Sequence, residues 1–124
     1  MSPKLRILVG EDDTFYAKIF QLKLTKEGYD VCIASNGEEV VALSRSYKPK
    51  LILLDLIMPR KNGFDALAEL QNDTSLSSIP VIVFSNLSQD EDIAKATSLG
   101  AKHYMVKSNV SIQEMLEAVK KFAI

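Results

Sequence analysis

A chain of 124 residues has the length of one ordinary domain, so we expect a single domain over residues 1–124. Hydrophobic residues make up 47% of the chain and charged residues 25%, and these globular proportions exclude a disordered chain. The formal net charge of -1 provides no general attraction to nucleic acid or anionic membranes, so we expect no direct nucleic-acid partner.

Nothing in the sequence indicates a targeting signal or a membrane span. Residues 1–6 lead directly into a strand-like segment, and the longest aliphatic run stops at Asp55, so we expect no membrane insertion. Cys32 has no second cysteine for an intramolecular disulfide and is expected to be a small buried apolar residue. These features predict a complete, cytoplasmic protein.

Short aliphatic runs alternate with helical patterns from one end of the chain to the other. The predicted strands are residues 5–9, 31–34, 51–54, 81–84 and 103–106. Each is followed by a helical pattern, and capping pairs are predicted for three of the helices: Asn36 with Glu39, Ser88 with Glu91, and Ser111 with Glu114. In the first helix the apolar stripe is predicted to be core, with Phe15, Tyr16, Ile19, Phe20, Leu22 and Leu24 as its members. Gly28 is placed to end that helix, and Pro49 closes the second.

The third strand carries the main site candidate. Four aliphatic residues between turn formers predict a strand that is buried on both faces of a parallel sheet. A carboxylate is costly to bury inside such a strand, so Asp55 is expected at its carboxyl end, facing a crevice. Pro59 then breaks the strand, and Asn62-Gly63 supplies turn chemistry before the next helix.

Alternating strands and helices predict a doubly wound α/β fold with a parallel sheet and helices on both faces. In such sheets ligands bind beyond the carboxyl ends of the strands. The polar residues expected to converge there are Glu11, Asp12, Asp13, Asp55, Ser85, Asn86 and Lys107.

Carboxylates that lie close together repel one another unless a cation sits between them, and Mg²⁺ is the hard divalent ion that suits a few carboxylates, water and phosphate oxygens. Lys107 adds a positive charge, and the Ser85 hydroxyl can donate to an oxyanion. We therefore expect a phosphoryl group as the guest. Asp55 is the predicted nucleophile because it alone among the carboxylates stands on the central strand.

Over essentially its whole length the chain resembles the receiver domain of two-component response regulators. The resemblance is carried by features at the family's spacing: Glu11-Asp12, Asp55, the turn from Met58-Pro59 to Asn62-Gly63, Ser85, Tyr104 and Lys107. It implies the strand order 2-1-3-4-5 and phosphorylation of Asp55 by a histidine kinase or a histidine phosphotransfer protein.

The resemblance also implies site roles and a stand-alone receiver. Magnesium would be bound by Glu11 or Asp12, by Asp55 and by the Ile57 carbonyl. Ser85 and Tyr104 would be the switch residues, remodelling the face of the fourth helix, fifth strand and fifth helix for a downstream protein. Because no residues follow the last helix to form an effector domain, we expect the receiver to stand alone and to act as a switch, not as a turnover enzyme.

Several positions depart from the family pattern. Asn86 stands where the family mostly has alanine or glycine, and we expect it to narrow access to the site. Ser108 replaces the usual proline, so a trans peptide before it is at least as favourable as a cis one. Gly10 replaces an aliphatic residue and is expected to loosen the end of the first strand. Ile57 and Leu87 are apolar at positions that tune dephosphorylation in the family, which predicts slow hydrolysis.

Three other functions compete with this reading. A pseudo-receiver would keep the fold and bind proteins without phosphate, and the departures at Gly10, Asn86 and Ser108 favour it, whereas the intact acidic, hydroxyl and lysine set opposes it. A flavodoxin-like flavin carrier needs a phosphate-cradling first loop, which three consecutive carboxylates would repel. A magnesium-dependent phosphatase of another α/β family needs an aspartate at the position of Ile57 and is rejected.

Overall fold

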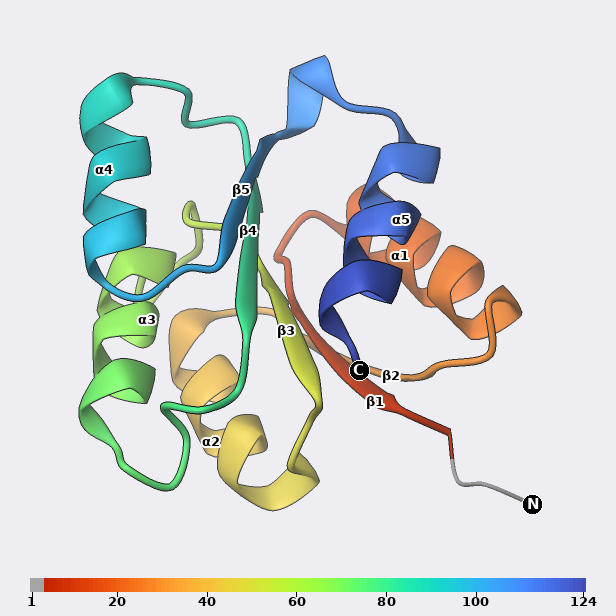
Figure 1. Ribbon diagram of the computed structural model, residues 1–124, viewed down its shortest axis with the longest axis horizontal. Coiled ribbons are helices and arrows are strands. Elements are labelled where there is room, and N and C mark those ends of the chain that lie inside the picture. The colour runs from red at the N-terminus through yellow and green to blue at the C-terminus, as the bar shows by residue number, and fades with distance from the viewer. Residues whose placement is uncertain (1–3) are drawn as a thin grey trace.

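A computed structural model describes residues 4–124, which form one five-stranded parallel sheet with helices on both faces (Figure 1). The strand order is β2-β1-β3-β4-β5, as predicted. The strands are β1 (Arg6–Gly10), β2 (Asp30–Ala34), β3 (Leu51–Leu54), β4 (Val81–Ser85) and β5 (His103–Val106). The helices are α1 (Thr14–Lys26), α2 (Gly37–Tyr47), α3 (Gly63–Asn72), α4 (Asp90–Ser98), α5 (Ile112–Phe122) and the short 3-10 helix η1 (Lys107–Asn109).

The central strand β3 explains why the sheet is covered on both sides. All four of its side chains are buried, and because side chains alternate along a strand they enter two different cores. Leu51 and Leu53 pack into the core beneath α1 and α5, whereas Ile52 and Leu54 pack into the core beneath α2, α3 and α4. Figure 1 shows α1 and α5 on one face of the sheet and the other three helices on the opposite face.

The helix starts agree only in part with the predicted capping pairs. Ser111 and Glu114 form the predicted capping box of α5. At α2 the Asn36 side chain accepts from the Glu39 N–H, but the Glu39 carboxylate accepts from the N–H and hydroxyl of Ser35. The predicted Ser88–Glu91 box at α4 is wrong. Gln89 precedes that helix without a side-chain cap, and three acidic residues in its first turn face the positive end of the helix dipole.

Two further predictions about packing are corrected. The stripe of α1 is not all core, since Phe15 is 67% exposed and Leu22 is 70% exposed, while Phe20 and Leu24 are buried. The first strand does not loosen at Gly10, because this residue is paired with both neighbouring strands and its carbonyl accepts from the Asp55 N–H at 2.9 Å. A Cβ at Gly10 would lie 2.8 Å from a Val40 methyl group, so a larger residue does not fit there without repacking.

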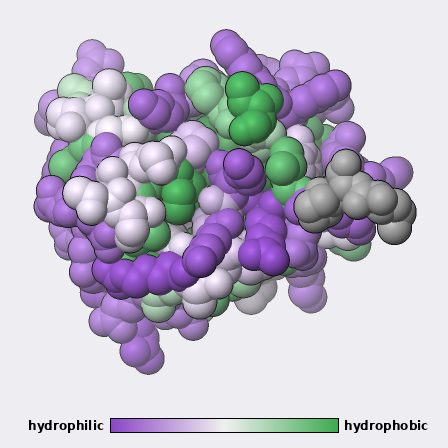
Figure 2. All heavy atoms as spheres, turned by 60° about the horizontal axis from the view of Figure 1, so that its bottom comes forward, coloured by the Kyte–Doolittle hydropathy of each residue, from purple (hydrophilic) through white to green (hydrophobic). Residues whose placement is uncertain are grey.

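One face of the molecule is predominantly polar (Figure 2). On the face shown in Figure 2, which brings the lower edge of Figure 1 forward, hydrophilic side chains predominate and apolar atoms form small separate patches. Cys32 is half-buried at the edge strand β2 and packs against the core beneath α2–α4. Within residues 4–124, none of the helices is long and apolar enough to cross a membrane.

Candidate functional site

The carboxyl ends of β1, β3 and β5 bring the predicted acidic residues and the lysine to one edge of the sheet. Adjacent pairing of β1 with β3 places the loop after Gly10 beside Asp55, and Lys107 follows directly after β5. A hollow of about 260 Å3 lies at this edge. It is lined by Glu11, Asp12, Asp13, Tyr16, Asp55, Ile57, Asn86 and Lys107.

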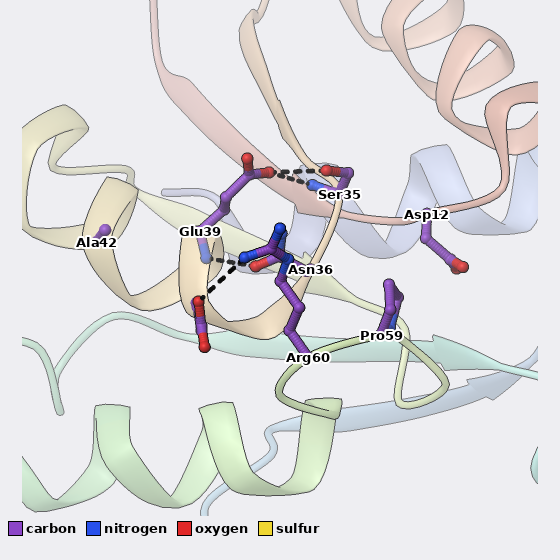
Figure 3. Close-up of a pocket in the computed structure, with 8 residues that line it drawn as sticks. Asp12, Ser35, Asn36, Glu39, Ala42, Pro59 and Arg60 are labelled. Atoms are coloured by element: carbon purple, nitrogen blue, oxygen red, sulfur yellow. Dashed lines mark hydrogen bonds and ion pairs between the residues drawn. The ribbon is translucent and has the colours of Figure 1, made fainter.

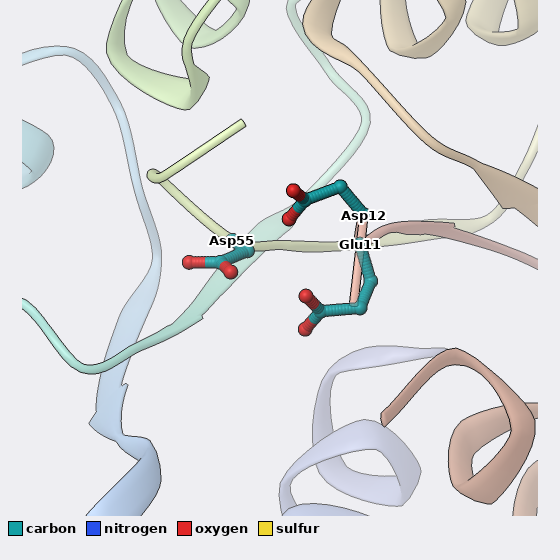
Figure 4. Close-up of side chains that lie close together, drawn as sticks. All are labelled: Glu11, Asp12 and Asp55. Atoms are coloured by element: carbon teal, nitrogen blue, oxygen red, sulfur yellow. The ribbon is translucent and has the colours of Figure 1, made fainter. Parts of the chain in front are cut away.

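Three carboxylates converge in this hollow. Glu11, Asp12 and Asp55 each offer one oxygen, and the three oxygens all lie within 4.8 Å of one another (Figure 4). Glu11 is 2% exposed and Asp55 is 6% exposed, whereas Asp12 stands at the open side. The neighbouring Asp13 has another task, since its side chain accepts from the N–H groups of Phe15 and Tyr16 and caps α1.

Lys107 is the cation that faces this cluster. Its Nζ lies 2.6 Å from Glu11 Oε1 and 3.0 Å from Asp55 Oδ2, and the side chain is 5% exposed. Burial alone would lower the pKa of Lys107, but the bonds to the two carboxylates outweigh that effect and raise it. The ammonium is therefore held charged beside the predicted nucleophile.

Burial disfavours the charged form of a group, so it raises the pKa of a carboxyl where it would lower that of a lysine. Glu11 shows this effect. Burial raises the pKa of this carboxyl to about 7, and repulsion from Asp55 adds to the rise, although the bond from Lys107 opposes it. One lysine does not balance three carboxylates, so the cluster retains excess negative charge when all of them are ionised. A hard divalent cation with oxygen ligands fits this donor set, and Mg²⁺ is typically bound through one or two carboxylates with water and phosphate completing its shell. Ile57 adjoins the cluster, because its N–H donates to Asp55 Oδ1 at 3.3 Å.

The two predicted switch residues meet through the loop after β4. Ser85 is fully buried, and its hydroxyl accepts weakly from the Leu87 N–H at 3.4 Å, so it does not line the hollow in this conformation. The Tyr104 hydroxyl donates to the Leu87 carbonyl at 2.6 Å, and its half-buried ring packs against the core beneath α2–α4. Leu87 thus contacts both predicted switch residues and lies away from the hollow itself.

Asn86, in contrast, stands on the wall of the hollow. Its side-chain oxygen accepts from the Ser108 N–H at 3.1 Å, which links the loop after β4 to the turn that carries Lys107. None of the peptide bonds within residues 4–124 is cis, so the bond between Lys107 and Ser108 is trans.

One residue on the wall was missed as a site residue by sequence reasoning. Tyr16 was assigned to the core stripe of α1, yet its ring centroid lies 4.4 Å from Lys107 Nζ. The only signal in the sequence is its place in the first turn of the helix that follows the acidic loop, three residues after Asp13.

A larger hollow of about 670 Å3 lies next to the site, on the far side of Asp12 (Figure 3). Its polar groups are largely occupied with one another: Glu39 accepts from Ser35, and Arg60 lies 3.9 Å from Glu38. It holds no buried cluster of acids and lysine, so we regard the smaller hollow as the functional site.

Comparison with known proteins agrees with this geometry. Residues 7–120 match the response regulator receiver domain family. The chain is 37% identical to protein PilH of Pseudomonas aeruginosa over 102 residues, which cover 82% of this chain and 84% of PilH. Other relatives are longer, and the chain spans about half of their length, such as 42% of the probable transcriptional regulator ycf27 of Porphyridium aerugineum.

Solved structures show the same arrangement of strands and helices. The phosphorylated cyanobacterial phytochrome response regulator RcpA superposes with a TM-score of 0.82 at 30% identity, covering 96% of this chain and 91% of RcpA. The Mn²⁺-bound form of response regulator Rcp1 gives a TM-score of 0.83 at 28% identity, covering 97% of this chain and 94% of Rcp1. Matched over nearly its whole length, the chain belongs to the response regulator receiver domains of two-component signalling.

Proposed function

We propose that this receiver takes a phosphoryl group onto Asp55 from a phosphohistidine on a histidine kinase or a phosphotransfer protein. One observation carries the proposal: the Asp55 carboxylate has two kinds of neighbour. It belongs to the three-acid cluster, and it also accepts a hydrogen bond from Lys107 at 3.0 Å. A carboxylate oxygen of Asp55 attacks phosphorus, the P–N bond of the donor breaks, and its electron pair stays on the imidazole nitrogen. Lys107 offers positive charge beside the oxygen that attacks.

Glu11, Asp12 and Asp55 are the residues that would hold magnesium, with the Ile57 carbonyl added on the strength of the family resemblance. When bound, the ion supplies charge neutralisation to the phosphoryl oxygens. The related RcpA has a phosphorylated form and Rcp1 has an Mn²⁺-bound form, which supports both a phosphoryl group and a divalent ion at the corresponding place here.

The surroundings of the hollow favour a protein as the donor. Phe15 is 67% exposed and Ile57 is 55% exposed, although large apolar side chains are usually buried. Ile57 lines the hollow, and the ring of Phe15 lies 5.8 Å from that of Tyr16, another lining residue. Apolar groups beside the entrance suit contact with a macromolecule that carries the phosphohistidine.

We propose that the conformational change caused by phosphorylation passes through the loop after β4. Leu87 links the two predicted switch residues, because its N–H donates to the buried Ser85 hydroxyl and its carbonyl accepts from the Tyr104 hydroxyl on β5. If the Ser85 hydroxyl moves to a phosphoryl oxygen, its bond to the Leu87 N–H is lost and the loop that Tyr104 holds must shift. We propose that this shift remodels the face formed by α4, β5 and α5, where a downstream protein binds.

The wider role follows the same line. We propose a cytoplasmic signalling switch that promotes phosphoryl transfer to its own Asp55 and slow self-dephosphorylation, without turnover of other substrates. That the receiver stands alone remains a prediction; the match to 84% of PilH supports it, and the size of the natural polypeptide tests it. That the protein does not bind nucleic acid also remains a prediction, and a DNA-binding assay tests it.

The direct test is phosphorylation by a small donor. Wild type incubated with acetyl phosphate and magnesium should gain one phosphoryl group by intact-mass spectrometry, and Asp55→Asn or removal of magnesium with a chelator should abolish the gain. A folded wild-type protein that gains nothing would contradict the proposal and favour the pseudo-receiver, for which the Asn86 side chain on the wall of the hollow is the specific observation.

A further inference from the structure

We infer that Tyr16 is a positioning residue for Lys107: its ring holds the lysine ammonium in the hollow when the carboxylates are engaged elsewhere. The inference deepens the proposed function and rests on it for its kinetic consequence, but the contact between ring and ammonium stands independently. The ring centroid lies 4.4 Å from Lys107 Nζ, within the range at which the negative face of an aromatic ring attracts a cation.

The setting makes this attraction strong. The Lys107 side chain is 5% exposed, and a cation–π contact is worth more when the cation is desolvated than at an open surface. The ammonium therefore has two kinds of partner, two anionic oxygens from Glu11 and Asp55 and one neutral ring from α1. Tyr16 is half-buried, so the ring also shields this side of the ion pairs from water.

The two kinds of partner respond differently to the reaction. Glu11 and Asp55 belong to the carboxylate cluster that would hold a divalent ion, and Asp55 becomes an acyl phosphate when it accepts the phosphoryl group. Both carboxylates are then engaged elsewhere and hold the ammonium less strongly. The ring takes no part in metal binding or in the transfer, so it is the partner that stays available to Lys107 throughout.

Two further aromatic residues, Phe20 and Phe84, form a row of ring contacts between Tyr16 and the sheet. The Tyr16 ring centroid lies 5.9 Å from that of Phe20, which is buried, and Phe20 meets Phe84 edge-on at 5.4 Å. Phe84 lies on β4 immediately before Ser85. This row of contacts fixes Tyr16 against the sheet, and a ring with a fixed place can fix the cation above it.

Three replacements of Tyr16 distinguish the electrostatic attraction of the ring from the packing of its side chain. Tyr16→Phe keeps the aromatic face, Tyr16→Leu removes it, and pentafluorophenylalanine at position 16 keeps a ring-shaped side chain with the quadrupole reversed. The measured quantities are the second-order rate constant for phosphorylation by acetyl phosphate, the magnesium affinity by calorimetry, and the NMR shifts of the Lys107 Cε protons. These protons are next to Nζ, which lies over the ring, so we expect the ring current to shield them.

We expect Tyr16→Phe to stay within about twofold of wild type, whereas the other two replacements lower the rate constant by roughly fivefold to tenfold. The Lys107 Cε protons should move downfield in the leucine variant and keep their position in Tyr16→Phe. Magnesium affinity should be unchanged in all three, because the ring is not a ligand, and a general collapse of the hollow would alter it.

Several results would overturn the inference. Among them are a leucine variant with the wild-type rate and shifts, a phenylalanine variant as slow as the leucine variant, and a parallel loss of magnesium affinity. If the leucine variant does not fold, the pentafluorophenylalanine protein decides, since it preserves the packing. If wild type accepts no phosphoryl group at all, the proposed function fails, while the Lys107 shifts still decide whether the ring holds the ammonium.

Discussion

Replacing Asp12 by asparagine should change the stability of the fold in opposite directions with and without magnesium. Asp12 lies with Glu11 and Asp55 in a cluster whose facing oxygens are within 4.8 Å of one another, and Lys107 pairs with the other two members. Without a metal ion the Asp12 charge therefore adds repulsion, and Asp12→Asn removes that charge at nearly constant shape.

The structure sets the size of the effect. At 4.8 Å two like charges repel by about 0.9 kcal/mol in a medium as polarisable as water, and Asp12 is exposed enough for that value to apply. Two such repulsions, partly offset by attraction to Lys107, give a gain of about 1 kcal/mol in the free energy of unfolding. With magnesium at about 100 times its dissociation constant, wild type gains about 2.7 kcal/mol, and the variant loses most of this because it lacks one ligand.

The assay is urea unfolding followed by circular dichroism at about pH 8, where Glu11 is mostly ionised, once with a chelator and once with magnesium. Asp13→Asn is the matched control, because Asp13 caps α1 and asparagine caps helices equally well. The control should keep wild-type stability and the full magnesium gain. An Asp12→Asn protein that is less stable than wild type in chelator, or that keeps the full magnesium gain, would refute the reasoning.

Three further predictions concern pH, access and lifetime. In metal-free protein the pKa of Glu11 is raised from 4.5 to about 7, so protonated Glu11 stabilises the fold fully below about pH 4.5. This stabilisation, roughly 3 kcal/mol, is lost as the pH rises through 7. Urea unfolding across this range should show the loss, and Glu11→Gln should flatten the pH dependence. Asn86→Ala opens the wall of the hollow and breaks the bond to Ser108, so phosphorylation by acetyl phosphate should be faster than in wild type, and equal rates would dispose of the idea. Ile57 and Leu87 cannot orient a water, so the phosphoryl group should be lost slowly, and release of radiolabelled phosphate within seconds would count against this.

Much of the fold could be predicted from the sequence, because each strand is a short aliphatic run between turn formers. The capping pairs in the sequence were less informative about where the helices start. Ser111 and Glu114 do form a box, but at α4 the helix begins one residue later than Ser88 requires, and Gln89 takes the capping position. Capping residues are recognised by type, whereas their register depends on how the preceding loop leaves the sheet.

The site was predictable where topology alone decides it. Glu11, Asp55 and Lys107 each follow directly after a parallel strand of one sheet, so all three lie at its carboxyl edge. Tyr16 could not be assigned to the site, because the rotation of α1 about its axis decides whether a residue in the stripe faces the core or the hollow. The same rotation leaves Phe15 exposed, which periodicity alone had placed in the core.

The central claim is that Asp55 receives the phosphoryl group, and the most direct measurement identifies the modified residue. Wild-type protein treated with acetyl phosphate and magnesium is reduced with borohydride, which converts an aspartyl phosphate to homoserine, and is then sequenced by tandem mass spectrometry. We expect homoserine at position 55 only in samples that contained both the donor and magnesium. Homoserine at another aspartate, or none in protein shown to be folded, would contradict the account.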